Sequence, residues 1–224
     1  MLGVTLASTS RSLGRLRESA AHLARARTLM HGRGFHAESD LCRNEAALWM
    51  LVGRFNLARE SLQAAWRLTP ASGELREIVQ LSQARLALAL GDLAQARALL
   101  EPVARRWQDA GFRRGLRRVW VLLAPTLAPD EALKLVEDEL ASALPGASVQ
   151  LRTRQAQALL SLGDAAGAWQ AAERAVDRME LAHPVDLTPA ELWLTLARAA
   201  QAAGAIPRPA EVARRGVAWV DWVA

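Results

Sequence analysis

Small and apolar residues recur along this chain at fixed distances from five glycines. Alanine lies seven residues before each of these glycines, and small or apolar residues fill the columns five, nine and twelve residues after them. The glycines are Gly14, Gly53, Gly91, Gly163 and Gly204, and the alanines are Ala7, Ala46, Ala84, Ala156 and Ala197. Because no stretch alternates apolar with polar residues as strands do, the pattern predicts a repeated helical element.

Each glycine is predicted to end the first helix of a hairpin, because a left-handed backbone costs little only for glycine. Asp92 and Asp164 directly follow their glycines and are expected to cap the second helix of the hairpin. The alanines on both sides of the glycine would lie where the paired helices cross, since small side chains permit close approach.

The glycines also predict how many hairpins the chain holds. Successive glycines are 39, 38, 72 and 41 residues apart, so the gap of 72 should contain one divergent repeat. There the segment 125–129 replaces the glycine turn, and Asp130 is expected to cap a helix that runs to Leu140. The chain is therefore predicted to be a single all-α domain of six hairpins. Their approximate bounds are 1–33, 34–72, 73–111, 112–146, 147–184 and 185–224.

The repeat resembles the tetratricopeptide family over nearly the whole chain. The family's consensus positions are matched by Trp193, Leu196 and Ala197 in one repeat, and by Gly53, Ala58, Leu62, Ala65 and Pro70 in another. The repeats exceed the family's unit of about 34 residues, and in this they are similar to the irregular arrays of bacterial signal-transduction ATPases and large transcriptional activators. The resemblance implies an α-α superhelix, or solenoid. It also implies a scaffold or sensor module for signal transduction or transcriptional regulation, which holds a partner segment in the groove lined by its first helices.

Five residues are expected to face that groove, because they lie ten, six or three positions before a repeat glycine, on one face of the first helix. They are Arg11, Arg43, Arg85, Gln157 and Arg198. They could converge across the repeats on a protein or peptide partner, and the arginines would suit an acidic one. The alternative is that they are ordinary solvated positions in an arginine-rich chain, and the sequence leaves both open.

The composition fits a folded helical chain with a positive charge. Hydrophobic residues make up 51% of the sequence, tyrosine is absent, and the formal net charge is +5. Lys134 is the only lysine, so arginine carries almost all the positive charge. Either an anionic partner or a GC-rich genome that favours arginine codons explains this bias.

A cluster of six arginines between Arg105 and Arg118 raises a second function. Because Trp107, Phe112 and Trp120 are interleaved with the arginines, the segment could grip single-stranded nucleic acid by charge and stacking. The favoured interpretation places the aromatic rings in the core and the arginines on a solvent-exposed face. Nucleic acid is therefore the alternative partner and protein the expected one.

The sequence carries no recognisable catalytic arrangement, so we expect no enzyme and no cofactor. His31, His36 and Cys42 lie close together, but no second pair of ligands completes the tetrahedron that zinc needs, and we expect no metal. Cys42 is the only cysteine, which fits a reducing compartment. No secretory signal and no membrane-spanning run is recognised, so the expected location is the cytoplasm.

The last eight residues are unusually apolar for the end of a helical array. Val212, Trp219 and Val223 would share one stripe that packs back on the chain, which leaves Val220 and Trp222 pointing elsewhere. We predict that these two residues contact a second copy of the chain or a domain of a parent protein. The alternative is a frayed final turn whose apolar residues are tolerated in water.

Overall fold

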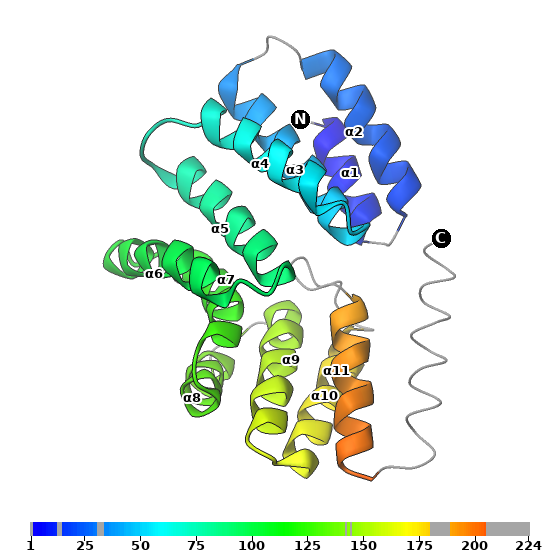
Figure 1. Ribbon diagram of the computed structural model, residues 1–224, viewed down its shortest axis with the longest axis vertical. Helices are drawn as coiled ribbons and strands as arrows, with labels where there is room; N and C mark the ends of the chain where they lie inside the picture. Colours follow the sequence, from blue (N-terminus) through cyan, green and yellow to red (C-terminus); the bar gives the residue numbers. More distant parts are fainter. Residues whose placement is uncertain are drawn as a thin grey trace. The chain divides into compact units, whose positions relative to one another are not determined.

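The computed structural model describes residues 2–12, 15–30, 34–141, 143, 145–179 and 189–204 (Figure 1). Within these ranges the chain is helical and contains no strand. The α-helices are α1 (Leu2–Ser12), α2 (Leu16–Met30), α3 (Phe35–Leu51), α4 (Phe55–Leu68), α5 (Glu74–Ala89), α6 (Leu93–Asp109), α7 (Arg113–Leu123), α8 (Pro129–Leu140), α9 (Pro145–Ser161), α10 (Ala165–Met179) and α11 (Pro189–Ala202), and a short 3-10 helix, η1 (Ala124–Thr126), joins α7 to α8. The predicted all-α repeat fold is confirmed.

The helices belong to two compact units. Unit 1 ends at Arg106 and holds α1 to α5 with most of α6, whereas unit 2 begins at Trp107 and holds α7 to α11. The six predicted repeat bounds stay a prediction, and the second half of the sixth repeat lies outside the described residues.

Within each unit the helices follow one packing rule. We call α1, α3, α5, α7, α9 and α11 the first helices, and the helix that follows each of them the second helix. In unit 1, α3 packs on both α1 and α2, and α5 packs on both α3 and α4. In unit 2, α9 packs on both α7 and α8, and α11 packs on both α9 and α10. A first helix is therefore more enclosed than a second helix.

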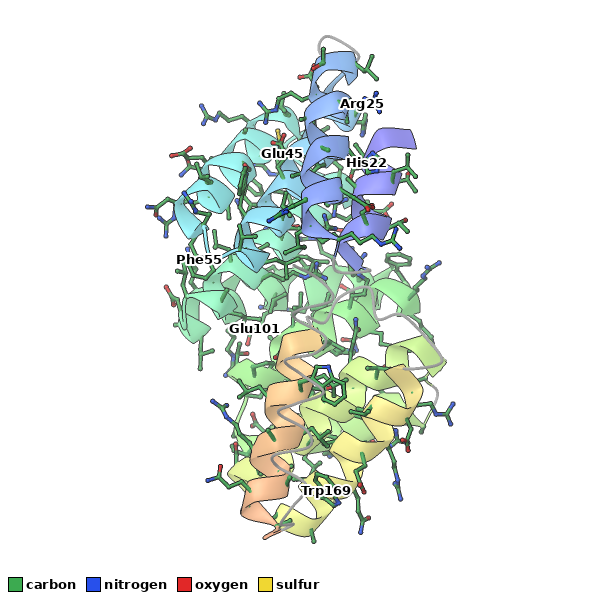
Figure 2. The ribbon with its side chains drawn as sticks, turned by 90° about the vertical axis from the view of Figure 1, so that its right-hand side faces the viewer. His22, Arg25, Glu45, Phe55, Glu101 and Trp169 are labelled. Atoms are coloured by element: carbon green, nitrogen blue, oxygen red, sulfur yellow. The ribbon has the colours of Figure 1, made fainter. Side chains whose placement is uncertain are left out.

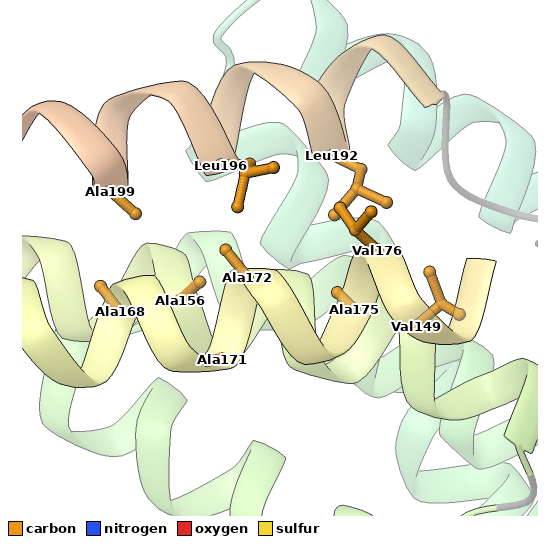
Figure 3. Packing of buried hydrophobic residues seen from close by; sticks show 10 residues of the cluster. All are labelled: Val149, Ala156, Ala168, Ala171, Ala172, Ala175, Val176, Leu192, Leu196 and Ala199. Carbon is orange, nitrogen blue, oxygen red and sulfur yellow. The ribbon is translucent and has the colours of Figure 1, made fainter. Parts of the chain in front are cut away.

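Most of the small residues predicted at the helix crossings are fully buried, and Ala197 is half-buried. Ala7, Ala46, Ala84 and Ala156, seven residues before the glycine, have no exposed surface, and neither do Ser19, Ala58, Ala96 and Ala168, five residues after it. In unit 2 these alanines belong to the core between α9, α10 and α11, where Ala156, Ala168 and Ala172 face Leu196 and Ala199 (Figure 3). Small side chains let the helices approach closely, as predicted.

The glycine turns are also confirmed where they can be seen. Gly53, Gly91, Gly163 and Gly204 have φ values of 72°, 77°, 81° and 65°. Asp92 and Asp164 cap the second helices as expected, since their Oδ1 atoms each accept a backbone N–H, from Gln95 and Gly167, at 2.9 Å. Gly14 lies outside the described residues.

The divergent fourth hairpin replaces the glycine turn with η1, and its second helix ends at Leu140 as predicted. The predicted cap is wrong, because the helix begins at Pro129 with Ala128 as its N-cap and no side chain caps it. Proline suits the first helical position, since its fixed φ matches a helix and its missing N–H costs nothing there. Asp130 therefore lies inside the first turn.

Candidate functional site

Buried polar side chains gather on the first helices. Among the described residues, every buried polar side chain except Ser19 and Thr69 lies on one of them. The set is Ser10, Ser39, Asn44, Glu45, Ser82, Ser148, Gln150, Thr153, Arg154 and Thr195. Burying a polar group is costly unless it is hydrogen-bonded, so these side chains must find partners on their own helix or on a neighbouring one.

In unit 1 the polar side chains connect α3 to both helices before it. Arg11 of α1 donates from its Nη1 and Nη2 atoms to the backbone oxygen and Oδ1 of Asn44, both at 3.2 Å. Arg27 of α2 forms an ion pair with Glu45, which is labelled in Figure 2. This contact raises the pKa of Arg27, chiefly through the hydrogen bond to Glu45. Charge-assisted bonds of this kind fix the angle between neighbouring hairpins.

The other two candidates of unit 1 lie further along the first helices. Arg43 of α3 is half-buried and pairs with Asp40, one turn before it. Its Nε atom is buried and has no hydrogen-bond acceptor among the described residues. Arg85 lies half-buried on α5.

In unit 2 a single guanidinium connects three first helices. Arg154 of α9 donates from Nε to the backbone oxygen of Val121 on α7 at 2.9 Å. Its Nη1 atom donates to Oε1 of Gln157 at 2.7 Å and forms an ion pair with Glu191 of α11. Gln157 in turn donates to Oγ1 of Thr195 at 3.0 Å. Gln157 is therefore part of an internal polar network, whereas Arg198 is exposed on α11.

A hollow of about 210 Å³ lies beside this network, between the segment 124–132 and the second half of α9. It is lined by Ala124, Pro125, Leu127, Pro129, Ala132, Arg154, Gln157, Ala158 and Ser161. The helix α7 has 11 residues against 17 in α9, so η1 and the two prolines stand where a longer first helix would continue. The divergent turn thus creates the hollow.

The size of the side chain at position 158 also contributes to the hollow. Five residues before the turn glycine, α1 has the exposed Thr9, whereas α3 and α5 have Leu48 and Leu86. These two leucines are 4% and 6% exposed and fill the space between hairpins. The same position in α9 is Ala158, which is equally buried but much smaller. Alanine also occupies this position in α11, as Ala199. In α9 the small side chain of Ala158 leaves the hollow open, where a leucine like that of α3 or α5 would fill it.

Sequence reasoning placed the five candidates on first helices but missed their surroundings. Arg154, Glu191 and Thr195 were not predicted, and Val220 and Trp222 lie outside the described residues. The missed signal is the column nine residues before the glycine, which is polar in all five repeats that have a turn glycine: Thr5, Asn44, Ser82, Arg154 and Thr195. All but Thr5 are buried.

The arginine cluster considered for nucleic acid is partly engaged within each unit. In unit 1, Arg106 pairs with Glu77 at 2.6 Å, and in unit 2, Arg117 pairs with Glu139 at 3.4 Å. Trp107 is 4% exposed and packs edge-on against Phe112, with the ring centroids 5.2 Å apart. A ring buried in this way cannot stack on a nucleotide base.

The described residues offer little reactive chemistry. No group of three or more histidine, cysteine or acidic side chains among them could hold a metal ion. Cys42 is buried, and burial raises the pKa of its thiol, followed by the negative charge of Glu45. His36 is exposed, and His31 lies outside the described residues. None of the helices in the described ranges has both the length and the apolar character needed to cross a bilayer.

Several solved structures share this fold, although no protein-family model and no curated protein matches the chain. BtubC (BKLC) from P. vanneervenii has a TM-score of 0.57 at 16% identity, over 92% of this chain and 89% of that one. The apo quorum sensor NprR from B. thuringiensis has a TM-score of 0.62 at 12% identity, over 91% of this chain and 60% of NprR. The TPR-like repeats of a putative kinesin light chain from P. anserina have a TM-score of 0.54 at 21% identity, over 80% of this chain and 92% of theirs. The chain therefore has the fold of a tetratricopeptide-like helical array.

Proposed function

We propose that this chain is a non-catalytic interaction module that binds an extended segment of a partner protein along the first helices of its hairpins. The observation that carries the proposal is the concentration of buried polar side chains on those helices. Contacts such as Arg11 with Asn44 in unit 1, and Arg154 with Val121 and Glu191 in unit 2, hold neighbouring first helices in fixed register within each unit. A rigid surface loses little conformational freedom when a flexible segment binds to it.

The arginines on the first helices of each unit support an acidic partner. Arg43, Arg85 and Arg198 lie on first helices of the two units, and guanidinium groups suit carboxylates. Arg11 and Gln157 would act differently, since both already bond to the next first helix and would support the surface from within.

We propose that this interaction module acts as a sensor or regulator. One solved structure of the same fold is a quorum sensor, which supports a role in detecting a signal. The buried Cys42 fits the reducing cytoplasm, which is the setting we propose.

The test starts from a displayed library of random peptides selected against the full chain. Binding of the enriched peptides is then measured by calorimetry to the wild type and to a variant with Arg43→Glu, Arg85→Glu and Arg198→Glu. The matched control reverses Arg25, Arg59 and Arg174, which are exposed on the second helices α2, α4 and α10.

We expect the selected peptides to be rich in aspartate and glutamate. Their affinity should fall about tenfold or more in the first-helix variant only, which corresponds to a loss of roughly 1.4 kcal/mol in binding free energy. Failure to enrich any peptide, or an equal loss in the control, would contradict it. Retention of single-stranded DNA with a steep dependence on salt would favour the nucleic-acid alternative instead.

A further inference from the structure

The hollow beside η1 has the capacity for one side chain. Its volume of about 210 Å³ is below that of pockets for drug-sized ligands, which begin at about 300 Å³. It is above the roughly 150 Å³ of an apolar cavity that holds benzene. The hollow therefore suits a single residue of a longer chain.

Its walls select for an aliphatic group. Pro125, Leu127, Pro129 and Ala132 line it from the segment 124–132, and Ala158 lines it from α9. The two prolines are stiff, and alanine has no side-chain freedom with which to close the space. A small aliphatic side chain would bury apolar surface there without displacing any wall residue.

The polar edge of the hollow offers hydrogen-bond donors. The side chain of Arg154 is 9% exposed, and its Nε and Nη1 atoms donate to Val121, Gln157 and Glu191. Its Nη2 atom makes no hydrogen bond with any residue that the structure describes. This group belongs to a mostly buried side chain and can donate to an acceptor that a ligand supplies.

The positive charge of Arg154 at this edge is already balanced by a carboxylate. Glu191 neutralises Arg154, so a second carboxylate near the guanidinium would be repelled by the first. A neutral acceptor, such as a main-chain carbonyl oxygen, avoids that repulsion and still receives the hydrogen bond.

We infer that the hollow is the anchor subsite for one small aliphatic residue of the partner segment, whose neutral carbonyl oxygen accepts from Arg154. The inference rests on the proposed function and adds the identity of the residue recognised in unit 2. It also explains why the side chain at position 158 is small, because the leucine found at this position in α3 and α5 would close the subsite.

The test uses the full chain, labelled at its alanine methyl groups, and two small probes followed by nuclear magnetic resonance. N-acetyl-leucinamide is the neutral probe, and N-acetyl-leucine is the same molecule with a free carboxylate. We expect the neutral probe to shift the Ala132 and Ala158 methyl signals in a saturable way, with a Kd several-fold lower than that of the carboxylate.

Two variants give the controls. Ala158→Leu should retain the fold, because leucine occupies this register position in α3 and α5, and should weaken the neutral probe about tenfold or more. Ala203→Leu, at an exposed position beyond the end of α11, should bind like the wild type. If Ala158→Leu fails to fold, Arg154→Lys provides the second variant, since it keeps the charge but removes the forked donors.

Three results would overturn the inference: no saturable shift in the wild type, equal or tighter binding of the carboxylate, or unchanged binding in the folded variant. The experiments distinguish a failure of this inference from a failure of the proposed function. The selected peptides could still bind through the first-helix arginines while the neutral probe does not bind.

Discussion

Arg154 of α9 and Glu191 of α11 form an ion pair between successive first helices of unit 2. The arginine side chain is 9% exposed and the glutamate 33%, so the pair is shielded from water on one side only. The same guanidinium also donates to Val121 of α7, which makes it the centre of the polar network in this unit.

Removing Arg154 should therefore destabilise unit 2. We expect Arg154→Ala to lower the free energy of unfolding by about 2 to 3 kcal/mol, because a carboxylate and a carbonyl oxygen lose a charged donor. Urea denaturation measures the change. The control is Arg174→Ala, an exposed position on α10 that should change stability by less than about 0.5 kcal/mol. Equal effects of both substitutions would show that the network does not stabilise the unit.

The helix crossings predict a contrast between two alanines of α10. Ala168 has no exposed surface, so Ala168→Leu should cost about 1 to 3 kcal/mol through overpacking. Ala166 is exposed on the same helix, and Ala166→Leu should have almost no effect. Thermal unfolding compares the two. If Ala168→Leu leaves the melting temperature unchanged, this alanine does not lie at a tight crossing.

Cys42 predicts a loss of stability in alkaline solution. Burial raises the pKa of its thiol above the ordinary value of 9.0, so the folded state holds its proton more tightly than the unfolded state. This contribution to stability is fully present below about pH 9 and is lost as the pH rises through the folded pKa. Between pH 8 and about pH 10 the wild type should therefore lose more stability than Cys42→Ala, as measured by urea denaturation. Parallel losses in both proteins would exclude the thiol as the cause.

The apolar C-terminal segment predicts self-association. If Trp222 and Val220 contact a second copy, the intact chain should be a dimer in light scattering after size exclusion. A chain that ends at Gly216 and the variant Trp222→Glu should both be monomeric, because a charged residue opposes burial of the apolar surface. Monomers in all three cases at high micromolar concentration would refute the prediction.

The sequence was sufficient to predict the repeat because sterics fix it locally. Only glycine readily adopts the turn at Gly163, and only a small residue such as Ala168 fits a close crossing, so both leave a periodic signal. The N-cap of α8 was misplaced by two positions, because Ala128 takes this place instead of Asp130 and Pro129 begins the helix without a side-chain cap.

The candidate site was harder to predict because its residues pair across repeats. Arg154 and Glu191 are 37 residues apart, and no local spacing indicates that they meet. The hollow depends on the small side chain of Ala158, at a position that holds leucine in α3 and α5, combined with a short helix in the preceding hairpin. To predict the hollow from the sequence, one must compare the residues five and nine positions before the turn glycine across the repeats.

Hydrogen exchange of the full chain, with and without a selected acidic peptide, tests the central claim most directly. Binding slows exchange at amides that the ligand covers or rigidifies. The account predicts that protection appears on first helices, in α3 and α5 of unit 1 and in α9 and α11 of unit 2. Protection confined to the second helices α2, α4 and α10 would contradict it.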